Sequence, residues 1–419
     1  MSFLLTSVKI IDATSKHHLK NRNVFINKGK IEYIGSDKPD AKQVIDAKGC
    51  ILSQGLCDLQ ANYADPGFEQ KEDLESGSSA AGRGGFTEVA VLPNTHPVIQ
   101  KKNDVKYITK KNSSSLVQLY PLAAITIDAK GEALTDMLDL AEAGAVAFTD
   151  GLNPIWNSDI LLKSLQYIKK INGLIIDKPE DKWLALFGTM HEGVNSALLG
   201  MKGIPSLAEE LIVSRDIEVL TYTGGRLHLS NISTAKSVKL IQKAKKKGLD
   251  ITCDVAAHQL VFDDSSVKGF DANYKVSPPF REVSDSKALI KGLQDGTIDA
   301  IVSSHQPHDP ECKQLEFDMA DFGIIGQQTT LPMLSGIAKT VGWELLLNKM
   351  TIEPRKILQL KAATIEEGNV ANLMLFNPSE KWKYTLDNNV SKSENSPLLN
   401  TQLTGKVKAV FNNGQSDIF

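Results

Sequence analysis

Short apolar segments alternate with amphipathic segments along the middle of the chain, and this alternation predicts the fold class. The apolar segments have the length of strands and cover residues 52–62, 88–93, 117–126, 145–150, 173–177, 226–231, 250–256 and 300–305. The segments between them are rich in Ala, Leu, Lys and Glu, which favour helices; examples are 132–143, 157–171, 234–247 and 285–293. Eight strand–helix units in roughly 300 residues match a (β/α)8 TIM barrel of the α/β class. A doubly wound open sheet fits less well, because no G-x-G-x-x-G follows the first strand.

Both ends of the chain have a different pattern, made of short strands and turns. The apolar segments here are 3–11, 23–26 and 31–34 near the N-terminus, and 373–376 and 403–411 near the C-terminus. Since strand-rich tails flank an alternating middle, we expect one small composite β-sandwich domain built from both termini. The predicted domains are residues 1–53 with 365–419 for this β-domain, and 54–364 for the barrel.

Composition and charge narrow the class of function. Apolar residues make up 42% of the chain and charged residues 23%, which is ordinary for a globular protein. The 47 basic and 50 acidic residues give a net charge of −3, so no basic excess favours a nucleic-acid partner. The four cysteines show no C-x-x-C spacing, so they predict no disulfide framework. The first apolar run breaks at Thr6 without a signal-peptide pattern, and no run is long enough for a membrane helix; we expect a cytoplasmic protein.

Polar residues at the end of the first barrel strand are the first sign of chemistry. Asp58, Gln60 and Asn62 are spaced at i, i+2 and i+4, so their side chains share one face of the strand. TIM barrels place their active sites at these strand ends. The spacing leaves two interpretations open: a ligand or metal site, or a hydrogen-bonded polar plug.

A series of motifs then resembles one known family. The motifs are GLCDLQANYADPG (55–67), GGFT (84–87), LPNT (92–95), TGGRLH (223–228), YKVSPPFR (274–281), DGTID (295–299) and SKSENSP (391–397). Together they resemble the dihydroorotase family of cyclic amidohydrolases over essentially the whole chain. The resemblance implies a TIM barrel with a composite β-domain. For an intact member it also implies zinc-dependent hydrolysis of dihydroorotate to N-carbamoyl-aspartate in pyrimidine biosynthesis.

The chain departs from the family pattern at the positions that carry the chemistry. The family's metal ligands fall on Gln60, Asn62, Asp150, Lys178 and Asn231, of which Asp150 alone keeps the family residue. The general-base aspartate falls on Ser304, and the arginine that holds the substrate carboxylate falls on Ala64. Positions that contact substrate in the family fall on Asn94, Ser277 and His308.

These replacements predict a pseudoenzyme without a metal cofactor. A bound metal makes hydroxide available by lowering the pKa of water to about 7, and zinc sites use three or more Cys, His or carboxylate ligands. Neutral amides are weak ligands, and Lys178 brings an ammonium group to the same place. Ser304 is neither acidic nor basic near pH 7. We expect Lys178 to pair with Asp150 or Asp58 in the barrel mouth.

Three functional hypotheses follow from the resemblance. The first is a catalytically inactive family member, expected to be a homo-oligomer, that acts as a structural or regulatory partner of aspartate transcarbamoylase. The second is an active dihydroorotase with zinc in a rebuilt site made of His258, His305 and Asp150. The third is a metal-free scaffold similar to the non-enzymatic relatives of hydantoinases. The family motifs favour the first over the third.

Overall fold

The predicted barrel is present in the computed structural model, which describes residues 1–111 and 115–419. Eight parallel strands follow one another in the order β15-β14-β13-β10-β9-β8-β7-β6. These strands are β6 (Leu56–Ala61), β7 (Phe86–Val91), β8 (Gln118–Ala123), β9 (Ala147–Phe148), β10 (Leu174–Asp177), β13 (Arg226–Leu229), β14 (Ile251–Ala256) and β15 (Ala300–Val302). A parallel bridge between Ala61 and His305 joins the first and last strands, so the sheet closes. The fold class predicted from the apolar pattern is confirmed.

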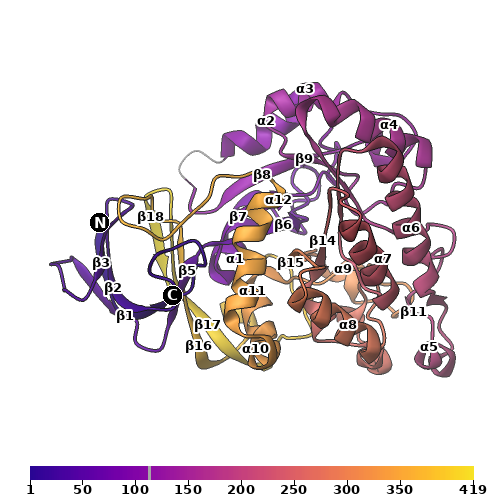
Figure 1. Cartoon of the computed structure of the whole chain (residues 1–419). Coiled ribbons are helices and arrows are strands. Elements are labelled where there is room, and N and C mark those ends of the chain that lie inside the picture. Colours follow the sequence, from indigo (N-terminus) through magenta and orange to yellow (C-terminus); the bar gives the residue numbers. More distant parts are fainter. Residues whose placement is uncertain (112–114) are drawn as a thin grey trace.

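Helices surround the barrel on its outer side (Figure 1). The α-helices of the described chain are α1 (Leu74–Gly84), α2 (Lys102–Lys111), α3 (Met137–Ala143), α4 (Ser158–Ile168), α5 (Val194–Leu199), α6 (Ser206–Thr223), α7 (Ala235–Lys246), α8 (Val283–Gln294), α9 (Pro310–Lys313), α10 (Thr330–Val341), α11 (Trp343–Met350) and α12 (Ile352–Ile357). Of these, α5 and α9 are short helices in the loops after β10 and β15. Several begin at a side chain that accepts hydrogen bonds from the free N–H groups of the first turn. Asp73 does this for α1 and Thr234 for α7.

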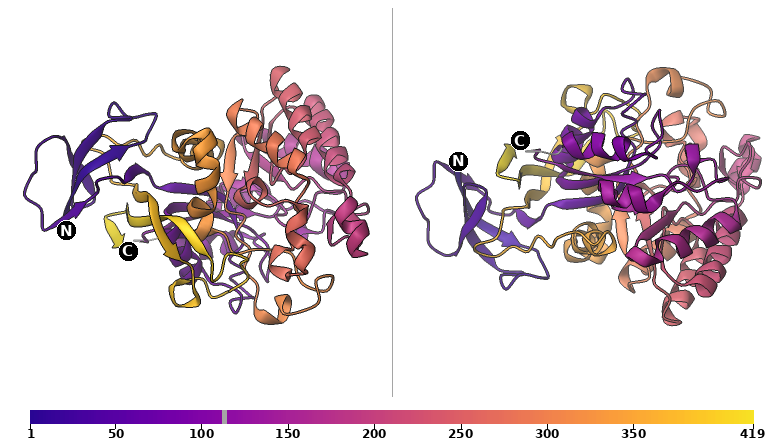
Figure 2. Two further views of the ribbon diagram at one scale, coloured as in Figure 1. Left: turned by 90° about the horizontal axis from the view of Figure 1, so that it is seen from below. Right: turned by 90° about the horizontal axis from the view of Figure 1, so that it is seen from above.

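The two ends of the chain meet in a second sheet beside the barrel (Figures 1 and 2). Its strands are β1 (Ser2–Ile10), β2 (Asn21–Asn27), β3 (Lys30–Gly35), β4 (Gln43–Asp46), β5 (Ile51–Gln54), β16 (Leu373–Lys383), β17 (Gln402–Asn412) and β18 (Gln415–Ile418). Strand β5 pairs with both β1 and β16, so it connects the N-terminal strands to the C-terminal ones. A separate apolar core that includes Leu5, Leu52 and Leu373 supports this sheet.

The continuous apolar segment 52–62 does not form one strand, as the pattern suggested. It divides at Gly55 into β5 of the terminal sheet and β6 of the barrel. The backbone at Gly55 packs closely on its neighbours, since a Cβ atom there would lie 2.2 Å from the Thr87 side chain. This close packing lets the chain pass directly from one sheet to the other.

A short third pair of strands, β11 (Met190–His191) and β12 (Gly203–Ile204), lies outside both sheets. It brackets α5 in the loop region after β10. Among the described residues, no helix combines the length and the apolar character needed to cross a membrane.

Candidate functional site

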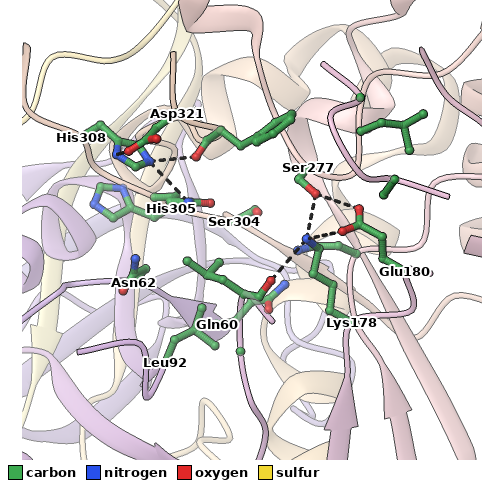
Figure 3. A pocket seen from close by; sticks show the side chains of 18 residues that line it. Gln60, Asn62, Leu92, Lys178, Glu180, Ser277, Ser304, His305, His308 and Asp321 are labelled. Atoms are coloured by element: carbon green, nitrogen blue, oxygen red, sulfur yellow. Dashed lines mark hydrogen bonds and ion pairs between the residues drawn. The ribbon is translucent and has the colours of Figure 1, made fainter. Parts of the chain in front are cut away.

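A cavity of about 390 Å³ opens at the carboxyl ends of the barrel strands, where TIM barrels place their active sites (Figure 3). Side chains from six of these ends line it, together with residues of the long loops. The polar lining residues are Gln60, Asn62, Lys178, Glu180, Asn231, Ser277, Ser304, His305, Gln306, His308 and Asp321. Most of the positions predicted from the sequence are therefore brought together around one space.

Lys178 occupies one side of this cavity and is almost completely buried. Its ammonium group donates to Ser277 Oγ at 2.8 Å and lies 3.4 Å from Glu180 Oε1, and Ser277 in turn donates to Glu180 Oε2 at 3.1 Å (Figure 3). The expected pairing of Lys178 with Asp150 or Asp58 is therefore wrong. The ammonium pairs with the carboxylate two residues further along its own segment.

The two carboxylates expected as partners of Lys178 are satisfied elsewhere. Asp150 accepts hydrogen bonds from the N–H and the hydroxyl of Thr126, at 2.9 and 2.5 Å. Asp58 accepts from the N–H and hydroxyl of Ser303 and from Gln327 Nε2. Burial raises the pKa of Asp150, and burial raises the pKa of Asp58 to about 6 despite these donors.

Three carboxamide side chains line the cavity, and among the described residues each has one buried polar atom without a hydrogen-bond partner. Gln60, Asn62 and Asn231 keep only 7%, 8% and 8% of their surface exposed. Within the described part of the chain, Gln60 Nε2, Asn62 Oδ1 and Asn231 Oδ1 have no hydrogen-bond partner. Buried polar atoms are normally paired, so the cavity offers neutral donors and acceptors to water or to a small ligand.

Two lining residues adopt an unusual backbone conformation. Asn231 and Ser304 have φ angles of 54° and 49°, in the left-handed region that most residues avoid. Both follow barrel strands, β13 and β15 respectively. Such conformations cost about 1–3 kcal/mol each. They concentrate at functional sites, where the surrounding structure holds a side chain in one direction despite this cost.

Of the three positions expected to contact a ligand, Ser277 and His308 line the cavity, whereas Asn94 is not among its lining residues. The Asn94 side chain donates to Asp150 O at 3.1 Å and accepts from Leu152 N–H at 2.9 Å. It therefore fastens the loop after β9. These contacts reach across the fold to a segment after β9, so the Asn94 side chain has a structural role in this structure.

The rebuilt metal site proposed from His258, His305 and Asp150 is not assembled. His258 packs edge-on against Phe280, with 5.5 Å between ring centroids, and burial lowers its pKa to about 4. His305 accepts from Gly326 N–H through Nδ1, and its Nε2 lies 3.5 Å from a Glu72 carboxylate oxygen. The Asp150 carboxylate accepts hydrogen bonds from Thr126, so the three side chains do not meet at one site.

A different group of potential metal ligands lies on the rim of the cavity. His308, Cys312 and Asp321 bring one ligand atom each within 4.8 Å of one another, and they are the one such group of three among the described residues. The family pattern points to His308 alone and gives no sign of Cys312 and Asp321 beside it. The available signal was the four-residue spacing of His308 and Cys312 around Pro310, where a short helix begins.

Fold comparison defines the class of protein. L-hydantoinase from Arthrobacter aurescens superposes with a TM-score of 0.85 at 21% identity, covering 100% of this chain and 97% of that one. A D-hydantoinase gives a TM-score of 0.83 at 22% identity. The sequence model of the amidohydrolase family matches residues 187–416. The chain thus has the TIM-barrel fold of the amidohydrolases.

Sequence comparison then identifies the family within this class. The model described as Dihydro-orotase-like matches residues 49–237. The dihydroorotase of Geobacter sp. strain M21 is 38% identical over 99% of both chains. The dihydroorotase of Carboxydothermus hydrogenoformans is 40% identical over 92% of this chain and 91% of that one. This chain belongs to the dihydroorotase family.

Proposed function

We propose that this dihydroorotase-family protein does not hydrolyse dihydroorotate, and that it serves pyrimidine biosynthesis as a structural or regulatory partner of aspartate transcarbamoylase. One observation carries the first part of the proposal. The Lys178 ammonium lies in the barrel mouth, paired with Glu180 and surrounded by neutral amides, at positions that the family resemblance assigns to metal ligands.

The donor set of the barrel mouth does not fit a catalytic zinc ion. Zinc prefers thiolate, imidazole and carboxylate ligands, and a catalytic site needs three of them. Gln60, Asn62 and Asn231 offer only neutral amides, and Lys178 adds a positive charge that repels a divalent cation. Both oxygens of Asp150 already accept hydrogen bonds from Thr126.

The groups that would move protons and hold the substrate are also replaced. Ser304 stands where the family pattern has its general-base aspartate, and a serine hydroxyl does not exchange protons readily near pH 7. Ala64 stands where the pattern has an arginine for the substrate carboxylate, and alanine provides no hydrogen-bond donor from its side chain. Without a metal-bound hydroxide, a general base and an arginine for the substrate carboxylate, the cavity lacks the groups that would open the dihydroorotate ring.

The barrel nevertheless keeps the packing expected of a stable protein. Its strands, its closure through Ala61 and His305, and its continuous apolar core are complete. A folded barrel without chemistry is most simply explained as a binding scaffold. The proposed partner is aspartate transcarbamoylase, with assembly of several copies in the cytoplasm.

Turnover tests the catalytic part of the proposal. Dihydroorotate hydrolysis is measured with the purified chain after chelation and again with added Zn²⁺, beside the dihydroorotase of Geobacter sp. under identical conditions. We expect activity in the relative and none in this chain. Zinc-dependent turnover would contradict the proposal and establish the alternative, an active dihydroorotase with a rebuilt metal site.

Co-purification tests the partner separately. The aspartate transcarbamoylase of the same cell is mixed with this chain and run on a gel-filtration column, and its activity is assayed in the peak fractions. We expect co-elution or a change in transcarbamoylase activity. If both proteins elute as they do alone and activity is unchanged, the partnership is wrong even where inactivity holds.

A further inference from the structure

We infer that His308, Cys312 and Asp321 form a zinc-binding site on the cavity rim, distinct from the amide-lined barrel mouth. The three side chains offer an imidazole, a thiol and a carboxylate whose ligand atoms all lie within 4.8 Å of one another. Figure 3 shows His308 and Asp321 side by side at this edge of the cavity. The inference does not depend on whether the chain is an enzyme.

The imidazole of His308 already presents the correct nitrogen. Its Nε2 lies 2.8 Å from the backbone oxygen of Phe322, so this nitrogen carries the proton and donates. Nδ1 is left with its lone pair, and it lies 3.4 Å from Asp321 Oδ2. Metal-binding histidines commonly use this arrangement, because a backbone carbonyl on one nitrogen fixes the other toward the metal.

The backbone holds the three ligands in place before any metal binds. Asp321 N–H donates to Cys312 O at 2.9 Å, which joins the two loop segments directly. Cys312 N–H donates to Asp309 Oδ1 at 3.1 Å, and His308 N–H donates to Asn395 Oδ1 at 3.0 Å. A site with fixed ligands loses less conformational entropy on binding, which favours affinity.

A positive charge already occupies this group of ligands. The Lys71 ammonium lies 3.2 Å from His308 Nδ1 and 3.6 Å from Asp321 Oδ2, and it also interacts with the Cys312 thiol. The three ligands thus converge on a cation in this structure. Since Lys71 is partly exposed, its flexible side chain can turn into solvent when a divalent ion takes its place.

The ligand types select the metal. A thiolate with an imidazole and one carboxylate suits Zn²⁺, whereas Mg²⁺ and Ca²⁺ prefer sites made of oxygen atoms. Three protein ligands leave a fourth zinc position for water or another small ligand, and His308 and Asp321 both face the cavity. Cys312 is the one cysteine of the four that is not buried.

Calorimetric titration with Zn²⁺ tests the site, with matched variants that separate it from the barrel mouth. Wild type is expected to bind one ion. Cys312→Ser should weaken binding by at least about tenfold, because loss of a ligand costs no less than loss of its supporting contacts. Lys71→Met should bind more tightly than wild type, because it removes the competing ammonium. Lys178→Met, the matched change in the barrel mouth, should bind as wild type does.

Cobalt provides an independent readout. Co²⁺ bound at the site should give a thiolate charge-transfer band in the near ultraviolet that Cys312→Ser lacks, while circular dichroism shows that the variant stays folded. Equal zinc affinity in wild type and Cys312→Ser would overturn the inference, as would tighter binding in Lys178→Met alone. Dihydroorotate turnover, scored separately, decides only the proposed function.

Discussion

Removal of the Lys178 ammonium should destabilise the protein and leave a carboxylate without its counter-charge. In the Lys178→Met variant, Glu180 keeps Ser277 as a donor but loses the positive charge at 3.4 Å. Both side chains are largely buried, with 10% and 17% of their surfaces exposed. The remaining charge therefore stays in a poorly solvated place, which is the main source of the expected cost.

The size of the effect follows from the distance and the burial. Two unit charges 3.4 Å apart attract by about 5 kcal/mol at an effective dielectric constant near 20, and much of this offsets the cost of removing them from water. Breaking a fully buried pair from one side costs about 3–5 kcal/mol. Because this pair keeps some exposure, we expect Lys178→Met to lose about 2–3 kcal/mol.

A double-mutant cycle in equilibrium urea unfolding measures this coupling. Glu180→Gln removes the same charge from the other side and keeps a polar group beside Ser277. We expect the double variant Lys178→Met/Glu180→Gln to lose less stability than the sum of the single losses, by about 1–2 kcal/mol. Additive losses, or an unchanged free energy of unfolding in Lys178→Met, would refute the pairing of Lys178 with Glu180.

Three further effects on the free energy of unfolding are expected. Asp58 has a folded-state pKa of about 6, above its unfolded value near 3.9, so its contribution to stability is complete below pH 4 and is lost as pH rises through 6. Unfolding as a function of pH should show a loss of about 3 kcal/mol in this window that Asp58→Asn lacks. Arg355→Met removes the buried partner 2.6 Å from Glu88 and should cost about 3–5 kcal/mol in urea unfolding, so a loss below 1 kcal/mol would contradict the pair. Thr126→Val removes the hydroxyl donor of Asp150 and should cost about 1–3 kcal/mol, whereas Thr126→Ser should be nearly neutral.

The apolar pattern predicts the barrel well because both faces of its parallel strands are buried. Such strands appear as short continuous apolar runs, which are easy to locate. The same continuity hides the division of segment 52–62, because an apolar run gives no sign that the chain changes sheets at Gly55. In helix α6, Leu207, Leu211 and Tyr222 lie on the exposed face and weaken the amphipathic pattern, so its bounds are harder to locate from the sequence.

The candidate site was predictable where residues share one strand and less so where they meet across the fold. The two-residue spacing correctly brings Gln60 and Asn62 to the cavity. The predicted partners of Lys178, Asp150 and Asp58, are wrong: its partner is Glu180, two residues further along the same segment. Asp321 joins His308 only through folding of the long loop after β15, which sequence spacing does not show.

The carboxylates of the barrel mouth explain how the proposed loss of metal can be tolerated. A metal site gathers negative charges that repel one another when the ion is absent. In this chain each carboxylate has its own compensation: Asp150 has Thr126, Asp58 has Ser303 and Gln327, and Glu180 has Lys178. Since each of these carboxylates has its own hydrogen-bond donors or counter-charge, the proposed absence of a metal leaves none of the three without a partner.

It follows that restoring one ligand at a time should not restore metal binding to the barrel mouth. Lys178→His would remove the ammonium but leave Glu180 without its partner, while Thr126 would still occupy both oxygens of Asp150. In a Cys312→Ser background, which weakens the rim site, adding Lys178→His should leave zinc affinity as it is in Cys312→Ser alone. Tight zinc binding in that double variant would show that a single residue had kept the metal out, and that the hydrogen-bonded network around Asp150 yields readily to an ion.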